Sequence, residues 1–300
     1  MIVVMGASGH TGGVVAEKLL AKGEEVRVVG REANRLERFS KNGAQVATAD
    51  ATDASALAKA FSGADAAYVL IPPNVASDDP LGYSERVGNA IAAAVEQSRV
   101  PYVVLLSSIG ADKADKTGPV VGLHNLEQKL SAIPNLNALF LRAGYFMENL
   151  LPQVNVIRSV GSMAGPVRAD LALQMIATRD IGIAATEALL NRSFQGKTTR
   201  ELQGPKDRTY DEAAKTIGGA IGKAGLGYQQ MPAQILKGAL MQMGMSSNFV
   251  TLLLEMADAL NSGYMKALEP RSASNTTPTT LEAFINDTFV PAYRGQAASA

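Results

Sequence analysis

The sequence predicts an α/β protein in which a doubly wound parallel sheet is accompanied by a smaller, mostly helical domain. In the first half of the chain, short and nearly continuous apolar runs alternate with amphipathic stretches, a pattern typical of a parallel sheet with helices on both faces. A glycine-rich loop at residues 6–12 separates the first apolar run from the first amphipathic stretch. The 300 residues are enough for one large α/β domain and a smaller companion.

Six apolar runs are expected to form buried strands, namely Ile2–Met5, Val26–Val29, Gln45–Thr48, Ala67–Ile71, Val103–Leu106 and Ala138–Leu141. The stretches between them are expected to form helices over Thr11–Ala21, Ala33–Lys41, Ser55–Phe61, Tyr83–Gln97 and Val120–Ala132. Strands that alternate with helices in this way favour one doubly wound parallel sheet.

After Asn149 the pattern changes and helices dominate. The elements expected first are a loop or short hairpin over Gly161–Ala169, a helix over Ile181–Asn191 with Asp180 as its N-cap, and a strand over Thr199–Gln203. Later helices are expected over Tyr210–Gly222 with Thr209 as its cap, within Pro232–Leu260 with a break near Gly244–Ser247, and over Leu281–Phe289. We expect one domain to comprise residues 1–153 and about 180–204, and the smaller one residues 154–179 and 205–300.

Composition narrows the classes of partner. Lys and Arg together number 28, as do Asp and Glu, so the net charge is zero. A nucleic-acid partner is not expected, because such proteins usually carry a basic excess that neutralises phosphates. The sequence contains no cysteine, which excludes disulfides and thiolate chemistry. The two histidines, His10 and His124, are far apart in the sequence and predict no zinc site.

The cellular location is predicted from the apolar segments. The N-terminus leads directly into the apolar run Ile2–Met5 with no basic segment before it, so no signal peptide is expected. No apolar run approaches the roughly 20 residues of a membrane helix. We therefore expect a cytoplasmic protein without a membrane partner.

The strongest motif is Gly6-Ala7-Ser8-Gly9-His10-Thr11-Gly12, which follows the first strand and begins the first helix. The first glycine allows a tight turn, the second lets N–H groups approach a pyrophosphate, and the third lets the helix pack closely on the strand. The helix N-terminus adds unpaired N–H donors and the positive end of a dipole. The motif predicts a Rossmann dinucleotide site formed by Gly6, Ser8, Gly9, His10, Thr11 and Gly12. A purely structural glycine turn is the alternative.

The end of the second strand indicates which dinucleotide binds. NAD-selective folds place an Asp or Glu there, roughly 20 residues past the motif, to bond the ribose hydroxyls. This chain has Gly30-Arg31 instead, with Arg35 one helical turn further on, and an Arg can bind a 2′-phosphate through a charge-assisted contact. NADP(H) is therefore preferred. NAD(H) stays possible, because Glu32 and Arg38 lie nearby and the segment also fits a solvated helix start.

Residues after the later strands extend the predicted cofactor cleft. Asp50 and Ala51 follow the third strand, where the adenine ring would lie, whereas Asp53 is expected to cap the next helix. Ile71 and Pro72 end the fourth strand, at the edge where ligands bind in open parallel sheets. They either line the cleft or simply end the strand.

With these residues placed, the chain resembles the NmrA-like branch of the atypical short-chain dehydrogenase/reductase family over nearly its whole length. Besides the glycine loop, the resemblance rests on Asp50-Ala51-Thr52-Asp53, Leu106-Ser107-Ser108, Leu141-Arg142-Ala143-Gly144-Tyr145-Phe146-Met147-Glu148-Asn149 and Thr277-Pro278-Thr279-Thr280-Leu281-Glu282. It implies either an NAD(P)H-dependent reductase of quinones, dyes and related acceptors, or a regulator that senses NADP(H) without turning it over.

One departure from the wider family bears on the chemistry. Ordinary members use a Ser together with Tyr-x-x-x-Lys, in which the Lys lowers the pKa of the Tyr for proton transfer. Here Ser107 or Ser108 holds the Ser region, and the Tyr position is His124, followed four residues later by Gln128. Lys129 is rotated by roughly 140° from His124 on the helix and does not replace the missing Lys. Carbonyl–alcohol dehydrogenation by this route is not expected, whereas a quinone is already electrophilic and takes protons from water.

The candidate acceptor site consists of His124, Tyr145, Phe146 and Asn149. His124 is the candidate catalytic residue, as a donor to a substrate oxygen, with a surface histidine as the alternative. Tyr145 and Phe146 follow the sixth strand and would reach the cleft mouth, where aromatic faces suit a planar ring, although Phe146 also fits the core. A group of methionines fits either an adaptable apolar pocket or an irregular core, and its members are Met241, Met243, Met245, Met256 and Met265.

The favoured hypothesis is an NADPH-dependent oxidoreductase, a monomer or homodimer, that transfers hydride to a quinone-like or other aromatic small molecule. The alternative is an NADP(H)-sensing regulatory binding protein without turnover. Ser107 is assigned to the cofactor side of the site in either case.

Overall fold

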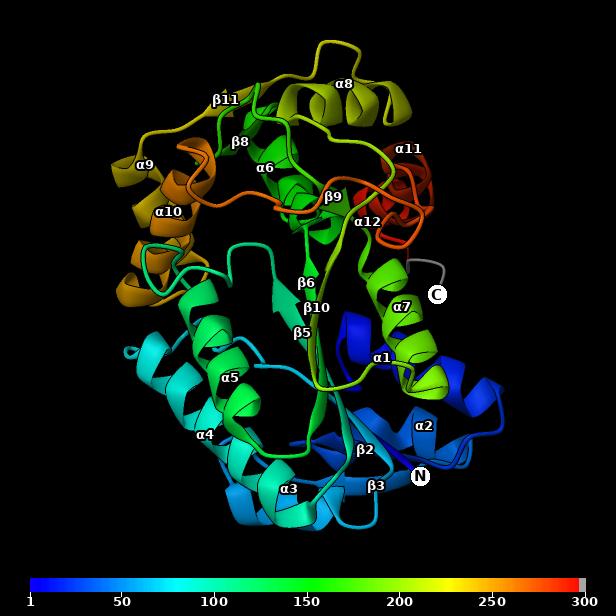
Figure 1. Cartoon of the computed structure of the whole chain (residues 1–300). Helices are drawn as coiled ribbons and strands as arrows, with labels where there is room; N and C mark the ends of the chain where they lie inside the picture. Colours follow the sequence, from blue (N-terminus) through cyan, green and yellow to red (C-terminus); the bar gives the residue numbers. More distant parts are fainter. Residues whose placement is uncertain (297–300) are drawn as a thin grey trace.

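A computed structural model describes residues 1–296 of the chain, and Figure 1 shows its layers. The central sheet has seven strands, and every neighbouring pair is parallel. In spatial order the strands are β10 (Lys197–Leu202), β6 (Asn137–Ala143), β5 (Tyr102–Ser108), β4 (Ala66–Val69), β1 (Ile2–Met5), β2 (Val26–Gly30) and β3 (Gln45–Thr48). From β1 the chain adds β2 and β3 on one side, and then β4, β5, β6 and β10 on the other side. This reversal of the strand order between β1 and β4 confirms the predicted doubly wound Rossmann fold.

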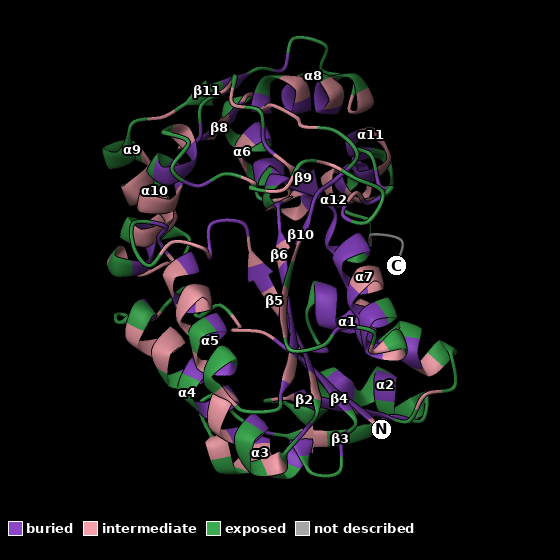
Figure 2. Ribbon diagram, viewed as in Figure 1, coloured by how far each residue is buried: buried purple, intermediate pink, exposed green. Residues whose placement is uncertain are grey.

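Helices cover both faces of this sheet (Figure 1). One face carries α1 (His10–Ala21), α2 (Glu37–Lys41) and α7 (Thr178–Asn191), whose apolar side chains share a core with the strands. The other face carries α3 (Ala54–Phe61), α4 (Pro80–Ser98) and α5 (Val120–Ala132), which form a second core with the same strands. The inner strands are buried from both sides, as Figure 2 shows, whereas the edge strand β3 is exposed and the edge strand β10 is buried only at its last two residues.

The first half differs from the prediction in details that have local causes. All six expected strands are present, but β4 ends at Val69, before the prolines that follow Ile71. The helix expected over Ala33–Lys41 is a 3-10 turn, Ala33–Leu36, followed by the single turn of α2. Helix α4 begins at Pro80, three residues earlier than expected, because the Asp79 carboxylate accepts a hydrogen bond from the Gly82 N–H.

The rest of the chain forms a smaller unit above the carboxyl ends of the strands (Figure 1). Its elements are β7 (Tyr145–Phe146), a 3-10 turn (Met147–Leu150), α6 (Gln153–Val160), β8 (Met163–Gly165), β9 (Met175–Ile176), α8 (Tyr210–Ala220), β11 (Tyr228–Gln230), α9 (Ala233–Gln242), α10 (Ser247–Asn261), α11 (Leu281–Phe284), a π turn (Ile285–Phe289) and α12 (Val290–Arg294). A separate hydrophobic core holds most of them together. The domain boundaries proposed from the sequence stay a prediction.

Two expectations for this second half are corrected. Gly161–Ala169 is not a hairpin, because its strand β8 pairs in parallel with the distant β11. Asp180 does not cap its helix, since α7 already begins at Thr178 and the Asp180 carboxylate accepts hydrogen bonds from the N–H and hydroxyl of Thr279 at 2.9 and 2.7 Å. The carboxylate of Glu148 takes the capping role, accepting from the N–H and hydroxyl of Thr178.

Other local expectations are confirmed. Thr209 caps α8 in a reciprocal capping box with Glu212, and Asp53 caps α3. The break expected near Gly244–Ser247 separates α9 from α10.

Within residues 1–296, no helix is long and apolar enough to cross a membrane, and no cluster of acidic and histidine side chains is arranged to hold a metal ion.

Candidate functional site

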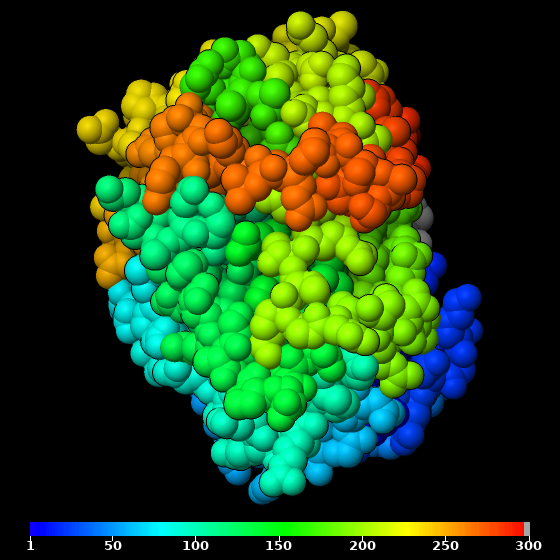
Figure 3. Space-filling view, in the orientation of Figure 1, coloured from blue at the N-terminus to red at the C-terminus, as the bar shows by residue number. Residues whose placement is uncertain are grey.

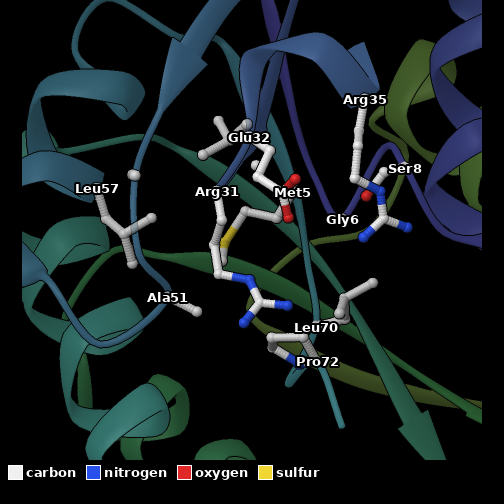
Figure 4. A pocket seen from close by; sticks show the side chains of 13 residues that line it. Met5, Gly6, Ser8, Arg31, Glu32, Arg35, Ala51, Leu57, Leu70 and Pro72 are labelled. Carbon is white, nitrogen blue, oxygen red and sulfur yellow. The ribbon is translucent and has the colours of Figure 1, made fainter. Parts of the chain in front are cut away.

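A pocket lies at the carboxyl edge of the sheet, beside the point where the winding reverses, and Figure 4 shows it from close by. It is formed by the ends of four neighbouring strands and by the glycine loop. Its lining comprises Met5, Gly6, Ser8, Val29, Gly30, Arg31, Glu32, Arg35, Ala49, Ala51, Leu57, Leu70 and Pro72. This is the position at which open α/β sheets bind nucleotides.

The glycines of the loop explain why its backbone is open to a ligand. Gly6 has a φ of +65°, and a Cβ there would lie 2.9 Å from Leu70 Cδ2. A Cβ on Gly12 would lie 2.5 Å from the Gly6 carbonyl oxygen, so the third glycine lets α1 pack against the loop. Gly9 has no such close neighbour, since a Cβ there would meet only the Gly6 oxygen at 3.3 Å. Its bare backbone therefore faces the open side of the loop.

The N-terminus of α1 fits an anion. No side chain caps this helix, and its first turn contains no acidic residue. The first N–H groups of a helix have no acceptor within it, and they carry the positive end of the dipole. Together with the bare loop glycines, these groups match what a pyrophosphate requires.

The other loop residues contribute unequally. Ser8 lines the pocket, and both Ser8 and His10 are exposed. Thr11 is buried, and its hydroxyl accepts a hydrogen bond from the Tyr68 hydroxyl at 2.9 Å. The buried side chain of Thr11 therefore lies toward Tyr68 and is not part of the pocket lining.

Basic groups dominate the far end of the pocket. Figure 4 shows the guanidinium groups of Arg31 and Arg35 within it, Arg35 beside Ser8 and Arg31 above Pro72. Among the described residues neither guanidinium forms an ion pair. Glu32 lines the same pocket, so a carboxylate is also within reach of a bound ribose.

The segments after β3 and β4 supply the remaining wall. Ala51 and Pro72 line the pocket, whereas Ile71 packs at the edge of the neighbouring core. Asp50 is turned toward Thr52, whose hydroxyl and N–H donate to its carboxylate at 2.6 and 2.8 Å. These hydrogen bonds lower the pKa of Asp50, and the positive charge of Arg31 adds a smaller effect in the same direction.

Ser107 does not face this pocket. Its side chain is buried, and its hydroxyl donates to the Glu127 carboxylate at 2.5 Å. The same carboxylate receives two hydrogen bonds from Arg142. Neither charged residue was singled out as a site residue from the sequence. The sequence offered one indication of a special role: Glu127 is a charged residue at a buried position of an amphipathic helix, and Arg142 is a charged residue within an apolar strand.

His124 is half-buried on α5, and its Nδ1 lies 2.9 Å from the carbonyl oxygen of Ala111. A carbonyl oxygen only accepts, so Nδ1 carries the proton of this hydrogen bond. The Nε2 atom of the neutral ring then has a free lone pair, and it donates only when the ring is protonated. Gln128 is exposed, and Lys129 forms an ion pair with Glu85 at 2.8 Å.

The structure brings together Tyr145 and Asn149 but separates them from Phe146. The Tyr145 hydroxyl lies 2.8 Å from that of Tyr210 and also receives a hydrogen bond from Asn149. Tyr210 in turn stacks on Tyr228 with ring centroids 4.4 Å apart. Burial raises the pKa of both Tyr145 and Tyr210, so both phenols are neutral at physiological pH. Phe146 packs against the core shared by α1 and α7.

Two of the methionines that the sequence analysis grouped together pack against a core, and two others do not. Met265 is buried against Gly110, and Met256 packs at the edge of the separate core of the smaller unit. Met241 and Met243 are instead 44% and 55% exposed, at the end of α9. They do not fill a core.

The chain has a Rossmann sheet, a glycine loop between β1 and α1, and a basic pocket where the strand order reverses. These features define a protein of the dinucleotide-binding class. The particular family is the NmrA-like family, to which the chain belongs, because the family model matches residues 1–285. Helix α5 carries His124 and Lys129 but no tyrosine.

Known relatives span almost the whole chain. An NAD(P)H azoreductase of Xenophilus azovorans is 25% identical over 272 residues, which are 89% of this chain and 87% of the relative. The prestalk A differentiation protein A of Dictyostelium discoideum is 25% identical and covers 96% of this chain and 92% of its own length. The NADPH-dependent quinone oxidoreductase of Escherichia coli, solved with NADPH, shares the fold with a TM-score of 0.81 at 21% identity, covering 96% of this chain and all (100%) of its own.

Proposed function

We propose that the protein is an NADPH-dependent oxidoreductase that reduces a quinone-like or other aromatic acceptor. The observation that carries the proposal is the pocket itself, in which an uncapped helix N-terminus and the unpaired guanidinium groups of Arg31 and Arg35 surround one concave site. A dinucleotide with a 2′-phosphate has the two anionic groups that this arrangement can bind. The azoreductase and the quinone oxidoreductase support this choice by their own cofactors.

Each part of the cofactor has matching groups in the chain. The backbone of Gly9 and the first turn of α1 would hold the pyrophosphate, Arg31 and Arg35 the 2′-phosphate, and Ala51 and Pro72 the adenosine. NAD(H) stays the alternative cofactor, because the carboxylate of Glu32 lines the same pocket and can accept hydrogen bonds from ribose hydroxyls. When bound, the nicotinamide supplies a hydride from its C4 atom.

On the acceptor side, His124 would orient an oxygen of the acceptor. The hydrogen bond from Nδ1 to Ala111 fixes the ring, so that Nε2, when it is protonated, would donate to this oxygen. Reduction of a quinone to a hydroquinone takes one hydride and one proton, and the proton comes from water or from a protonated His124. The hydroxyl of Tyr145, held by Tyr210 and Asn149, would contribute a neutral polar edge to the same mouth.

The proposal is tested by stopped-flow oxidation of bound NADPH against a panel of quinones and azo dyes. Turnover is expected with at least one class. His124→Ala should lower kcat/KM by no more than about tenfold, the value of one orienting hydrogen bond, and should leave NADPH affinity unchanged. A loss of about a thousandfold, typical of a general acid, would instead make His124 a proton donor.

The second candidate function is an NADP(H)-sensing regulatory protein without turnover. One observation favours it: α9 has no buried residue, although Ile235, Met241 and Met243 are apolar and exposed. Such a face suits a protein partner. Tight NADPH binding with no oxidation by any acceptor of the panel would decide for the sensor.

A further inference from the structure

A buried ion pair joins the sheet to α5 close to His124. The guanidinium of Arg142, on β6, donates to both carboxylate oxygens of Glu127, from Nε at 3.0 Å and from a terminal nitrogen at 2.5 Å. The exposed fractions of the two side chains are 14% and 3%. A bidentate pair of this kind fixes the relative orientation of its two elements.

The pair belongs to a row of polar side chains that crosses three strands. Ser107 on β5 and Glu201 on β10 are both in register with Arg142, so the three side chains project from the same face of the sheet. Ser107 donates to Glu127, which completes the row from the helix above. On β5 and β6 the other positions of this face, Val103, Leu105, Ala138 and Phe140, are part of an apolar core, so the polar pair is an exception within these two strands.

Two links connect this row to His124. Glu127 lies three residues after His124, on an adjacent part of the α5 surface. Arg142 also experiences the charge of Asp112, the residue that follows Ala111. The carbonyl of Ala111 is the acceptor for His124 Nδ1. Arg142 therefore interacts both with Glu127, on the helix that carries His124, and with Asp112, in the loop whose carbonyl group binds the His124 ring.

We propose that Glu127 and Arg142 are positioning residues for His124, in place of the missing Tyr-x-x-x-Lys pair. The proposal rests on the proposed function in one respect, that His124 meets the acceptor. Its physical reason is the cost of burying two charges. A buried ion pair seldom stabilises a fold more than apolar residues of the same size would, whereas its directional hydrogen bonds set geometry that apolar contacts leave loose.

If the Glu127 charge is removed, Arg142 keeps only Asp112 and Glu201 as nearby anions. The guanidinium then shifts toward Asp112, and the loop that carries Ala111 moves with it. The hydrogen bond to His124 Nδ1 weakens as a result. The neutral ring is then free to hold its proton on Nε2 as well.

The tautomer of His124 tests this directly. The chain has two histidines, so a ¹⁵N-labelled imidazole spectrum contains two sets of signals, and His10 serves as the internal reference. At about pH 8.5, where an ordinary imidazole is neutral, wild-type His124 should show the Nδ1–H form. Glu127→Gln should raise its Nε2–H fraction, and Ser107→Ala should do so to a smaller extent without threatening the fold.

The matched control is Lys129→Gln, which breaks the other ion pair of α5, with the half-exposed Glu85. It should leave both histidines unchanged. If the His124 signals are the same in wild type, Glu127→Gln and Ser107→Ala, the proposal is wrong. This readout needs no turnover, so it stands apart from the test of the proposed function.

A kinetic cycle provides the second readout. Because the weaker hydrogen bond to Ala111 leaves the protonated ring less well oriented toward the acceptor, Glu127→Gln should lower kcat by about threefold to tenfold, within the limit set by the His124 hydrogen bond. NADPH affinity should stay unchanged, because the pocket lined by Arg31 lies at other strands. In the His124→Ala background the same substitution should cause no further loss. An equal loss in both backgrounds would show a merely structural role and overturn the proposal.

Discussion

At the scale of single residues, the three glycines of the phosphate loop serve different physical ends. Gly6 needs its positive φ, and Gly12 needs the absence of a side chain because backbone atoms of Gly6 lie too close. Gly9 needs neither. Its φ of −97° and ψ of 179° are open to any residue, and a Cβ there would meet only the Gly6 carbonyl oxygen, at 3.3 Å. If the loop binds a pyrophosphate, the main requirement for glycine at this position would come from that ligand.

This difference predicts opposite phenotypes for two substitutions. Gly9→Val should abolish NADPH binding and leave the melting temperature nearly unchanged, because its methyl groups occupy the place of the pyrophosphate. Gly12→Ala should destabilise the fold by about 1–3 kcal/mol, the usual cost of overpacking. Calorimetric titration and thermal unfolding of both variants check this. Wild-type affinity in Gly9→Val would place the phosphate site elsewhere.

Cofactor choice should depend on two adjacent side chains of opposite charge. Arg31→Ala should weaken NADPH binding by roughly tenfold to a hundredfold, the value of a charge-assisted hydrogen bond, and leave NADH binding nearly unchanged. Glu32→Gln should weaken NADH only. Arg38→Ala is the control, since Arg38 is paired with Glu17 outside the pocket. Equal losses for both cofactors in Arg31→Ala would contradict the 2′-phosphate assignment.

More of the residues predicted for the cofactor lie together in one pocket than of those predicted for the acceptor. The glycine loop and Arg31 lie on consecutive elements, so spacing along the chain was sufficient to place them in one pocket. The Glu127–Arg142 pair joins a helix to a strand through side chains. No periodicity within either element indicates such a contact. For the same reason, the sequence did not indicate that the Ser107 hydroxyl donates a hydrogen bond to Glu127.

At the scale of elements, α8 and α9 show what stabilises a short helix. Helix α8 has a capping box and buries Tyr210, Ala213, Ala214, Ile217 and Gly218. Helix α9 has no side-chain cap and no fully buried residue. A helix of about ten residues is marginal in water by itself, so α9 depends on its junction with α10. The turn between them is held by Ser246, whose N–H donates to Val75 and whose hydroxyl donates to Ser77.

Amide hydrogen exchange should therefore be fastest in α9 among the longer helices. Its protection should be far below that of α8, a helix of nearly the same length, because local opening exposes no buried surface. Exchange followed by mass spectrometry, at two protein concentrations, measures this. Protection equal to that of α8 would contradict the prediction, and protection that rises with concentration would identify α9 as a contact of a homodimer.

Elements with strong periodicity were predictable, and those set by distant partners were not. The strands of the sheet and the helix α5 match their apolar patterns closely. Asp180 looked like a cap because Asp often is one, but a tertiary partner, Thr279, takes its carboxylate. The pairing of β8 with β11 joins segments more than sixty residues apart, beyond any local signal.

At the scale of the whole molecule, a strap between α10 and α11 joins the smaller unit to the sheet. It appears as the orange band across the face in Figure 3. Glu201, at the end of β10, accepts hydrogen bonds from the N–H groups of Leu268 and Glu269, both at 2.8 Å. Beyond the strap, Glu282 on α11 pairs with Arg208. The segment from Thr277 to Glu282, on which the family resemblance partly rests, therefore has a structural role.

These two carboxylates should make stability depend on pH in opposite directions. Burial raises the pKa of Glu201 above its usual 4.5, with Glu269 adding to the rise and Arg142 opposing it. Its contribution to stability is then complete below about pH 4.5 and declines as the pH rises through the folded-state value. For Glu282, burial acts to raise the pKa, but hydrogen bonding and Arg208 outweigh it and lower the pKa. Its contribution is complete above 4.5 and is lost at lower pH.

Urea unfolding of wild type, Glu201→Gln and Glu282→Gln from pH 3 to pH 8 measures both effects. The free energy of unfolding of wild type minus that of Glu201→Gln should fall as the pH rises above about 4.5, because only wild type must bury a charge there. The corresponding difference for Glu282→Gln should fall as the pH drops below about 4.5, because protonation ends the attraction to Arg208. Each variant controls for the other, since both replace one carboxylate by an amide at an end of the strap. Parallel slopes in the two variants would mean that the strap is not held by these charges, and that the smaller unit is fixed to the sheet by apolar packing alone.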